Sequence, residues 1–138
     1  MTPTPSIPTP KINVAAAVII DAAGKTLLSL RHLHSHQGGK WEFPGGKFEA
    51  GESAEQALHR ELKEELGIDI QRTEPFIELT YQYPEKVVKL HVLKVTQFTG
   101  KPEGREGQQV VWVSAEKLST LEFPDANYPI LEKLLGLF

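Results

Sequence analysis

A chain of 138 residues, 40% hydrophobic and 24% charged, has the size and composition of one globular domain. The absence of cysteine excludes disulfides, thiolate zinc sites and cysteine nucleophiles, and it fits the reducing cytoplasm, where we expect the protein to act as a monomer. A formal net charge of −3 gives no basic surface for a nucleic-acid polymer, and the longest mainly apolar stretch, residues 12–20, is too short to cross a bilayer, so we expect neither partner.

The N-terminal residues are set apart from the predicted fold. Prolines interrupt any apolar period in them, so we expect residues 1–11 to be a flexible Pro-rich tail and residues 12–138 to form the domain. An apolar run over 12–20 ends at a turn signal, Asp21-Ala22-Ala23-Gly24, and a second apolar run covers 26–30. This pattern predicts a strand, a turn and a strand.

A polar, His-rich surface loop is predicted over residues 31–40, followed by a sharp turn at Pro44-Gly45-Gly46. A helix is then predicted from Ser53, which forms a capping box with Gln56, to Gly67. The apolar residues that recur every fourth position in it, and that can pack on a sheet, are Ala54, Leu58, Leu62 and Leu66.

The second half of the chain is predicted to be mainly strands with a C-terminal helix. In chain order we expect strands over 76–83 and 87–95 joined by a hairpin at Pro84-Glu85-Lys86, a loop over 101–108, a strand over 110–113, and a helix over 130–135 with Pro129 in its first turn.

Three carboxylates are expected on one face of the predicted helix over 53–67. Glu61, Glu64 and Glu65 fall within an arc of about 100° at helical spacing. Such neighbours repel each other by roughly 0.2–0.5 kcal/mol per pair, so a purely structural role would favour a basic residue among them. Clustered hard oxygen donors without cysteine are typical of Mg²⁺ or Mn²⁺ sites.

The residues around these carboxylates resemble the Nudix box, G-x5-E-x7-R-E-U-x-E-E-x-G-U with U an aliphatic residue. Gly46, Glu52 and the segment Arg60-Glu61-Leu62-Lys63-Glu64-Glu65-Leu66-Gly67-Ile68 occupy every defined position. The resemblance implies an α+β Nudix fold, a mixed β-sheet sandwiched between helices. It also implies hydrolysis of a nucleoside diphosphate linked to another group. The implied cofactor is a divalent metal ion, Mg²⁺, for which Mn²⁺ can substitute.

The resemblance further implies roles for individual residues. Glu52 supports Arg60 or the waters on the metal, and Glu106 completes the metal site or takes a proton from water. The implied metal ligands are Gly45 through its carbonyl, Glu61, Glu64, Glu65 and Glu106.

A wider resemblance, to the MutT branch of the family, covers nearly all of the chain after Lys11. That branch cuts 8-oxo-dGTP to 8-oxo-dGMP and pyrophosphate, which removes an oxidised nucleotide from the pool. By this resemblance Arg31 and His36 face the phosphates. Phe43, Tyr83 and Leu90 frame the base, and Asn127 forms hydrogen bonds with the purine edge. The substrate-binding residues so implied are Arg31, His36, Phe43, Tyr83, Leu90 and Asn127, with Glu85 beside them.

Two alternatives concern the activity and one concerns a residue. The protein could instead be a related Nudix pyrophosphatase acting on CTP or a modified dCTP, which shares the Trp-Glu-Phe entry to the box. It could also be a non-catalytic nucleotide-binding Nudix domain, although such a domain is expected to lack one or more of the box carboxylates. Asn127 precedes Tyr128-Pro129, so it could simply cap the last helix.

Overall fold

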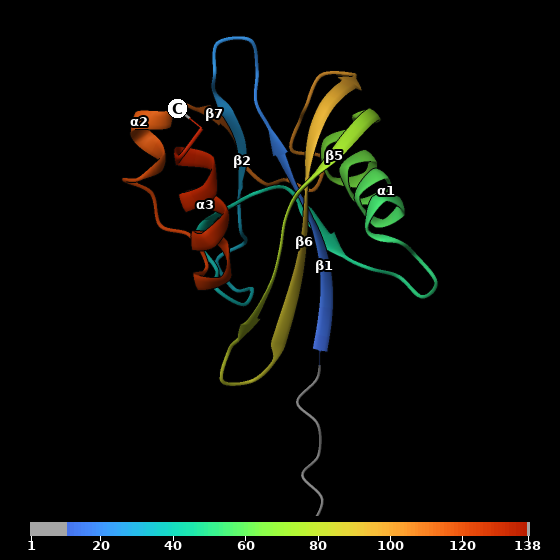
Figure 1. Ribbon diagram of the computed structural model, residues 1–138, viewed down its shortest axis with the longest axis vertical. Helices are drawn as coiled ribbons and strands as arrows, with labels where there is room; N and C mark the ends of the chain where they lie inside the picture. The colour runs from blue at the N-terminus through green and yellow to red at the C-terminus, as the bar shows by residue number, and fades with distance from the viewer. Residues whose placement is uncertain (1–10, 138) are drawn as a thin grey trace, which may run out of the picture.

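A computed structural model describes residues 11–137 of the protein (Figure 1). The predicted flexible tail therefore lies outside the described residues, except for Lys11, which belongs to the first strand, β1, and not to the tail. No helix within residues 11–137 is long and apolar enough to cross a membrane.

The strands of the described part form two sheets. One has the order β4-β1-β6-β5, in which β1 and β6 are parallel and the other pairs are antiparallel; the second has the antiparallel order β3-β2-β7. The first sheet contains β1 (Lys11–Ile19), β4 (Gly45–Lys47), β5 (Asp69–Gln82) and β6 (Val87–Thr99); the second contains β2 (Thr26–Leu30), β3 (Trp41–Glu42) and β7 (Val110–Val113). The helices are α1 (Ala54–Leu66), α2 (Ala115–Leu118), α3 (Tyr128–Leu135) and a 3₁₀ turn at Asp125–Asn127.

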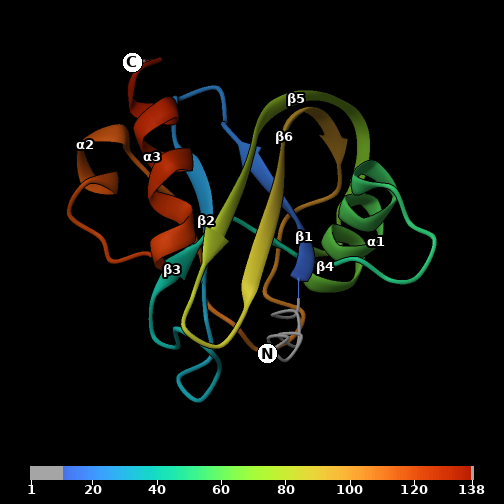
Figure 2. The ribbon, with the colours of Figure 1, turned by 60° about the horizontal axis from the view of Figure 1, so that its bottom comes forward.

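Alternate residues of β1 pack toward different helices. Ala15, Ala17 and Ile19 belong to one apolar cluster with the buried leucines of α1, whereas Ala16 and Val18 belong to another with α3. Figures 1 and 2 show α1 on one side of the strands and α3 on the other. The predicted mixed sheet between helices is therefore confirmed, and its strand period of two explains how one strand serves both cores.

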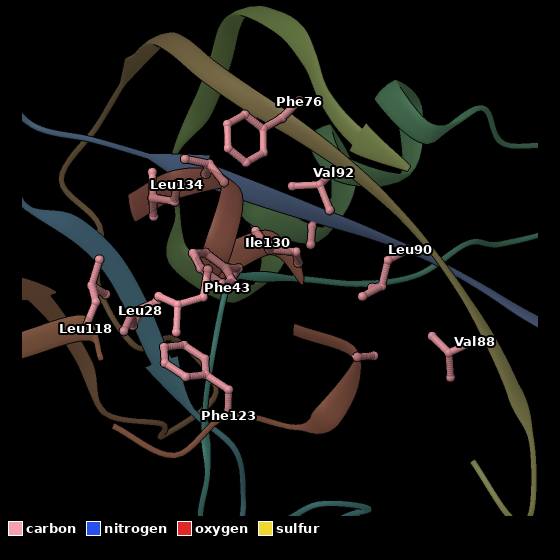
Figure 3. Packing of buried hydrophobic residues seen from close by; sticks show 14 of the residues in the cluster. Leu28, Phe43, Phe76, Val88, Leu90, Val92, Leu118, Phe123, Ile130 and Leu134 are labelled. Carbon is pink, nitrogen blue, oxygen red and sulfur yellow. The ribbon is translucent and has the colours of Figure 1, made fainter. Parts of the chain in front are cut away.

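The core on the α3 side joins the two sheets. Leu28 of the second sheet packs there with Val92 of the first, and Ile130 and Leu134 of α3 lie against them (Figure 3). Phe43, from the short connection between β3 and β4, stacks on Phe123 with ring centroids 5.7 Å apart. This connection thus runs through the core, between the sheets, and fixes where the following residues lie.

Most of the predicted elements are confirmed. Helix α1 has the Ser53/Gln56 capping box and ends at Gly67, and Pro129 lies in the first turn of α3. The apolar stripe of α1 differs in one residue, because Ala57 is fully buried while the predicted Ala54 is only half-buried.

Three predictions of secondary structure were wrong or incomplete. Strand β5 begins at Asp69 instead of residue 76, because its first half is an irregular edge strand with bulges and exposed polar residues that hide the period. The predicted turn at Pro44-Gly45-Gly46 is split, since β3 ends at Glu42 and β4 starts at Gly45, in different sheets. Helix α2 and the 3₁₀ turn at Asp125–Asn127 are too short to show a period in the sequence.

Candidate functional site

Four carboxylates from three parts of the chain line one cavity of ≈ 170 Å³, which we call the acidic cavity. They are Glu42 of β3, Glu61 and Glu65 of α1, and Glu106 of the loop before β7. The backbone of Gly45 and the hydroxyl-bearing Ser29 also line it. The structure thus brings together four of the five predicted metal ligands, Gly45, Glu61, Glu65 and Glu106, and adds Glu42.

Glu64 lies apart from this cavity. Its side chain is 56% exposed and its carboxylate pairs with Arg60 at 3.3 Å. The three carboxylates share α1 at the predicted spacing, but only Glu61 and Glu65 line the acidic cavity, and the Glu64 side chain lies on the helix surface beside Arg60.

Arg60 holds the carboxylates around it in place. Its guanidinium donates to Glu52 at 2.8 and 2.9 Å, to Glu61 at 2.8 Å and to the carbonyl oxygen of Lys47 at 2.9 Å. The hydrogen bonds from Arg60, and next the one from the Glu49 N–H, lower the pKa of Glu52 to about 2, and the bonds to Glu52 and Glu61 raise the pKa of Arg60. The network links α1 to the Gly-rich turn that precedes it.

Glu65 carries the most unfavourable charge of the site. Burial, followed by the negative charges of Glu42, Glu106 and Glu61, raises its pKa to about 8, while a hydrogen bond of 3.3 Å donated by Ser29 opposes the shift. Glu65 is only 6% exposed. Burial also raises the pKa of Glu61 and of Glu42, against the attraction of Arg60 and Arg31 respectively.

This crowding is the structural evidence that the residues fit a divalent cation. Hard oxygen donors that repel one another in a partly enclosed cavity gain most from a small, doubly charged ion. Among residues 11–137, no three acidic or histidine side chains are already arranged to hold one ion. Glu61 and Glu64 each accept a hydrogen bond from Arg60 through one carboxylate oxygen.

Gly46 leaves room for the Glu61 carboxylate where β4 approaches α1. A Cβ atom at this position would lie 2.3 Å from that carboxylate, so a larger residue would displace the Glu61 side chain. The absence of a side chain at Gly46 therefore lets the backbone of β4 approach the Glu61 carboxylate, which explains the glycine at the start of the motif.

A second cavity of ≈ 240 Å³, which we call the base cavity, adjoins the acidic cavity, because Arg31, Glu42 and Gly45 line both. Of the substrate-binding residues implied by the sequence, those that line the base cavity are Arg31, His36, Phe43, Tyr83, Leu90 and Asn127. Glu85 does not line it. Its carboxylate is turned to the Nδ1 atom of His36, 2.7 Å away, and is 54% exposed.

Arg31 stands at the wall between the two cavities. It donates to Glu42 at 2.6 Å and to the carbonyl oxygen of His36 at 2.8 Å. His36 lines the base cavity but not the acidic cavity. Its ring lies edge-on to Tyr83, and burial lowers its pKa. Of the two residues expected to face phosphates, only Arg31 thus reaches the acidic cavity.

Asn127 lines the base cavity, and it occupies the N-cap position of α3 without capping the helix through its side chain. The residue is 8% exposed, and its side chain makes no capping hydrogen bond to the helix within the described residues. The turn that carries it is held by Tyr83, whose hydroxyl oxygen accepts a hydrogen bond of 3.0 Å from the Ala126 N–H. The interpretation of Asn127 as a simple helix cap is therefore wrong.

Two residues that line the cavities, Ser29 and Glu42, are not predicted from the sequence. Ser29 is the one hydroxyl-bearing residue inside the otherwise apolar run 27–30, and it is 1% exposed, so its polarity was the available signal. Glu42 stands between Trp41 and Phe43, and only the tertiary structure shows that it faces both cavities.

An acidic helix that packs beside a Gly-Gly strand, on a mixed sheet between helices, is the arrangement of a Nudix protein. The model of the NUDIX domain matches residues 15–133, and the chain belongs to this family. It is 39% identical over 127 residues to the 8-oxo-dGTP diphosphatase of Escherichia coli K12, covering 92% of this chain and 98% of the relative.

A second relative and a solved structure are similarly close. The CTP pyrophosphohydrolase of Escherichia coli K12 is also 39% identical over 127 residues, which cover 92% of this chain and 94% of the relative. A MutT structure, from work on the Aliivibrio salmonicida and Vibrio cholerae proteins, superposes with a TM-score of 0.80 at 39% identity and covers 93% of this chain and 99% of its own. The predicted family and fold are thus confirmed.

Proposed function

We propose that the protein is a metal-dependent nucleoside triphosphate pyrophosphohydrolase that cuts 8-oxo-dGTP to 8-oxo-dGMP and pyrophosphate. The observation that carries this proposal is the pair of cavities with a common wall. The acidic cavity suits the metal ions and phosphates, and the base cavity, with Asn127 in its lining, suits a purine. The relatives named 8-oxo-dGTP diphosphatase support this reading.

Mg²⁺, or Mn²⁺ in its place, would be held by the Gly45 carbonyl, Glu61, Glu65 and Glu106, with Glu64 after it turns from Arg60. The ion would supply neutralisation of the phosphate charge and activation of the attacking water. Arg60 keeps Glu61 within reach of the site, and Glu52 in turn holds Arg60 through two hydrogen bonds. A carboxylate that lines the acidic cavity, such as Glu106, would be within the site to accept a proton from the attacking water.

Arg31 is the residue best placed to orient the phosphates. Its guanidinium lies at the wall that both cavities share, where a nucleotide would pass from base to phosphate. Because Glu42 and the carbonyl oxygen of His36 accept hydrogen bonds from Arg31, its side chain is fixed before the substrate binds.

A second candidate substrate is CTP or a modified dCTP. It rests on the equal identity, 39%, of the chain to a CTP pyrophosphohydrolase. A purely nucleotide-binding role is less well supported, because every carboxylate of the box is present and two of them, Glu61 and Glu65, line the acidic cavity.

A nucleotide panel tests the proposal. Pyrophosphate and phosphate release from 8-oxo-dGTP, dGTP, CTP and 5-methyl-dCTP would be measured with Mg²⁺. We expect pyrophosphate as the product and a kcat/KM for 8-oxo-dGTP at least ~10²-fold above that for dGTP, since several mismatched hydrogen bonds act together in a closed site. A higher value for CTP would transfer the assignment to the second candidate.

Removal of metal is expected to abolish turnover. The four carboxylates of the acidic cavity would repel the substrate phosphates until a cation lies between, so activity should vanish in excess EDTA and return with added Mg²⁺ or Mn²⁺. Pyrophosphate release after exhaustive chelation measures this. Full activity under those conditions would refute a metal-dependent mechanism.

A further inference from the structure

Glu106 reaches the acidic cavity from a loop, whereas Glu61 and Glu65 stand on a helix. A carboxylate on a loop is placed only as well as the loop is fixed, so the contacts of the 101–109 segment decide where Glu106 lies. The backbone of this loop is bonded to the C-terminal end of α1: Glu103 N–H donates to the Leu66 carbonyl and Arg105 N–H donates to the Glu65 carbonyl, both at 3.0 Å.

One side chain closes the connection at the site itself. The amide nitrogen of Gln108 donates to the Glu65 carbonyl oxygen at 3.1 Å, and its amide oxygen accepts from the Glu106 N–H at 2.9 Å. The two bonds fix which end of the amide is nitrogen, since a carbonyl needs a donor and an N–H needs an acceptor. Gln108 thereby joins the backbones of two carboxylate residues that lie on different elements.

The glycines of the loop make this geometry accessible. Gly107 has a φ of +81°, a left-handed conformation that lets the Gln108 side chain fold back onto Glu106. A Cβ atom at Gly104 would lie 1.9 Å from the Gln108 carbonyl oxygen, so the loop closes tightly on the backbone of the same residue.

We propose that Gln108 is a positioning residue for metal binding. Its side-chain amide links the backbone N–H of Glu106 to the backbone carbonyl of Glu65 and so holds the Glu106 carboxylate at the acidic cavity. This inference rests on the metal dependence proposed above. It assigns Gln108 no contact with the substrate or with the reacting atoms. Its effect is exerted on the order of the loop and on the affinity for the ion.

The variant Gln108→Met tests the proposal, because methionine keeps the length and much of the volume but can neither donate nor accept these bonds. Calorimetric titration with Mn²⁺ alone should show an affinity about 10-fold weaker than wild type, the usual scale for a residue that orients metal ligands. The drop in kcat should be larger than any rise in KM, and raising the Mn²⁺ concentration should restore part of it. The neighbouring Gln109→Met, whose exposed side chain does not line the acidic cavity, is the matched control and should leave both quantities unchanged.

Hydrogen exchange followed by NMR provides a readout that does not depend on activity. The Glu106 N–H belongs to an exposed residue but is expected to be protected in the wild-type protein, and to lose that protection in Gln108→Met. Rapid exchange in wild type, or Mn²⁺ affinity unchanged in a folded Gln108→Met protein, would overturn the proposal. If wild type itself bound no Mn²⁺ while its Glu106 N–H stayed protected, the metal-dependent function would fail and the loop connection would stand.

Discussion

Replacing Asn127 with alanine is expected to lower kcat/KM for 8-oxo-dGTP at least ~10-fold and to lower that for dGTP much less. Oxidation turns the N7 position of guanine from an acceptor into an N–H donor, and the Asn127 amide offers both a donor and an acceptor in the base cavity. Each hydrogen bond lost from a buried site costs roughly 1–3 kcal/mol, which corresponds to about 5- to 150-fold. Steady-state kinetics with both nucleotides measures the ratio.

The control for this variant is Asn13→Ala. Asn13, the other asparagine of the chain, contacts His91 on the sheet at 3.2 Å and does not line the base cavity. It should leave the ratio of the two nucleotides unchanged. If Asn127→Ala lowered the melting temperature but kept the ratio, Asn127 would be structural and the purine assignment would lose its main support.

The elements that the sequence predicts well are those with a regular local signal. Helix α1 was predicted to within its caps because Ser53, Gln56 and Gly67 act within a few residues of one another. Strand β5 was predicted only in part, because an edge strand with bulges needs no alternation of polar and apolar residues. The split of Pro44-Gly45-Gly46 from β3 was hidden for another reason: sheet membership is decided by partners distant in the sequence.

The site shows the same division. Helical spacing predicts that Glu61 and Glu65 lie near one face, and both line the acidic cavity, but the motif does not show that Glu64 pairs with Arg60 outside its lining. Glu42 became visible as a wall of both cavities only when the fold was known. Residues distant in the sequence therefore decide which charged side chains share a cavity. Local spacing shows only which side chains of one helix face the same direction.

Replacing Glu65 with glutamine is expected to lower kcat by at least ~10²-fold and to stabilise the metal-free protein at pH 8. Glutamine keeps the volume and the helix propensity but removes a buried charge that Glu42, Glu61 and Glu106 repel. Glu61→Gln, which removes charge from the same cavity, should lower kcat to a similar degree.

The pH dependence of the stability effect follows from the pKa of Glu65. Because its folded pKa is raised to about 8, the folded state binds this proton more tightly than the unfolded state does. The stabilisation due to the protonated form is complete below the ordinary carboxyl pKa of 4.5 and is lost as the pH rises to about 8. The gain from Glu65→Gln should therefore be small at pH 5 and on the order of 2 kcal/mol at pH 8, a rise of several degrees in Tm.

Thermal unfolding in EDTA at pH 5 and pH 8, together with steady-state kinetics in Mg²⁺, measures both effects. Glu132→Gln, an exposed glutamate of α3 outside both cavities, is the matched control and should change neither kcat nor the dependence of Tm on pH. Unchanged kcat in both Glu61→Gln and Glu65→Gln would place the chemistry elsewhere. A fall in Tm of the same size at both pH values would show that Glu65 supports the fold through its hydrogen bond with Ser29, and that its charge is not what the metal-free site must accommodate.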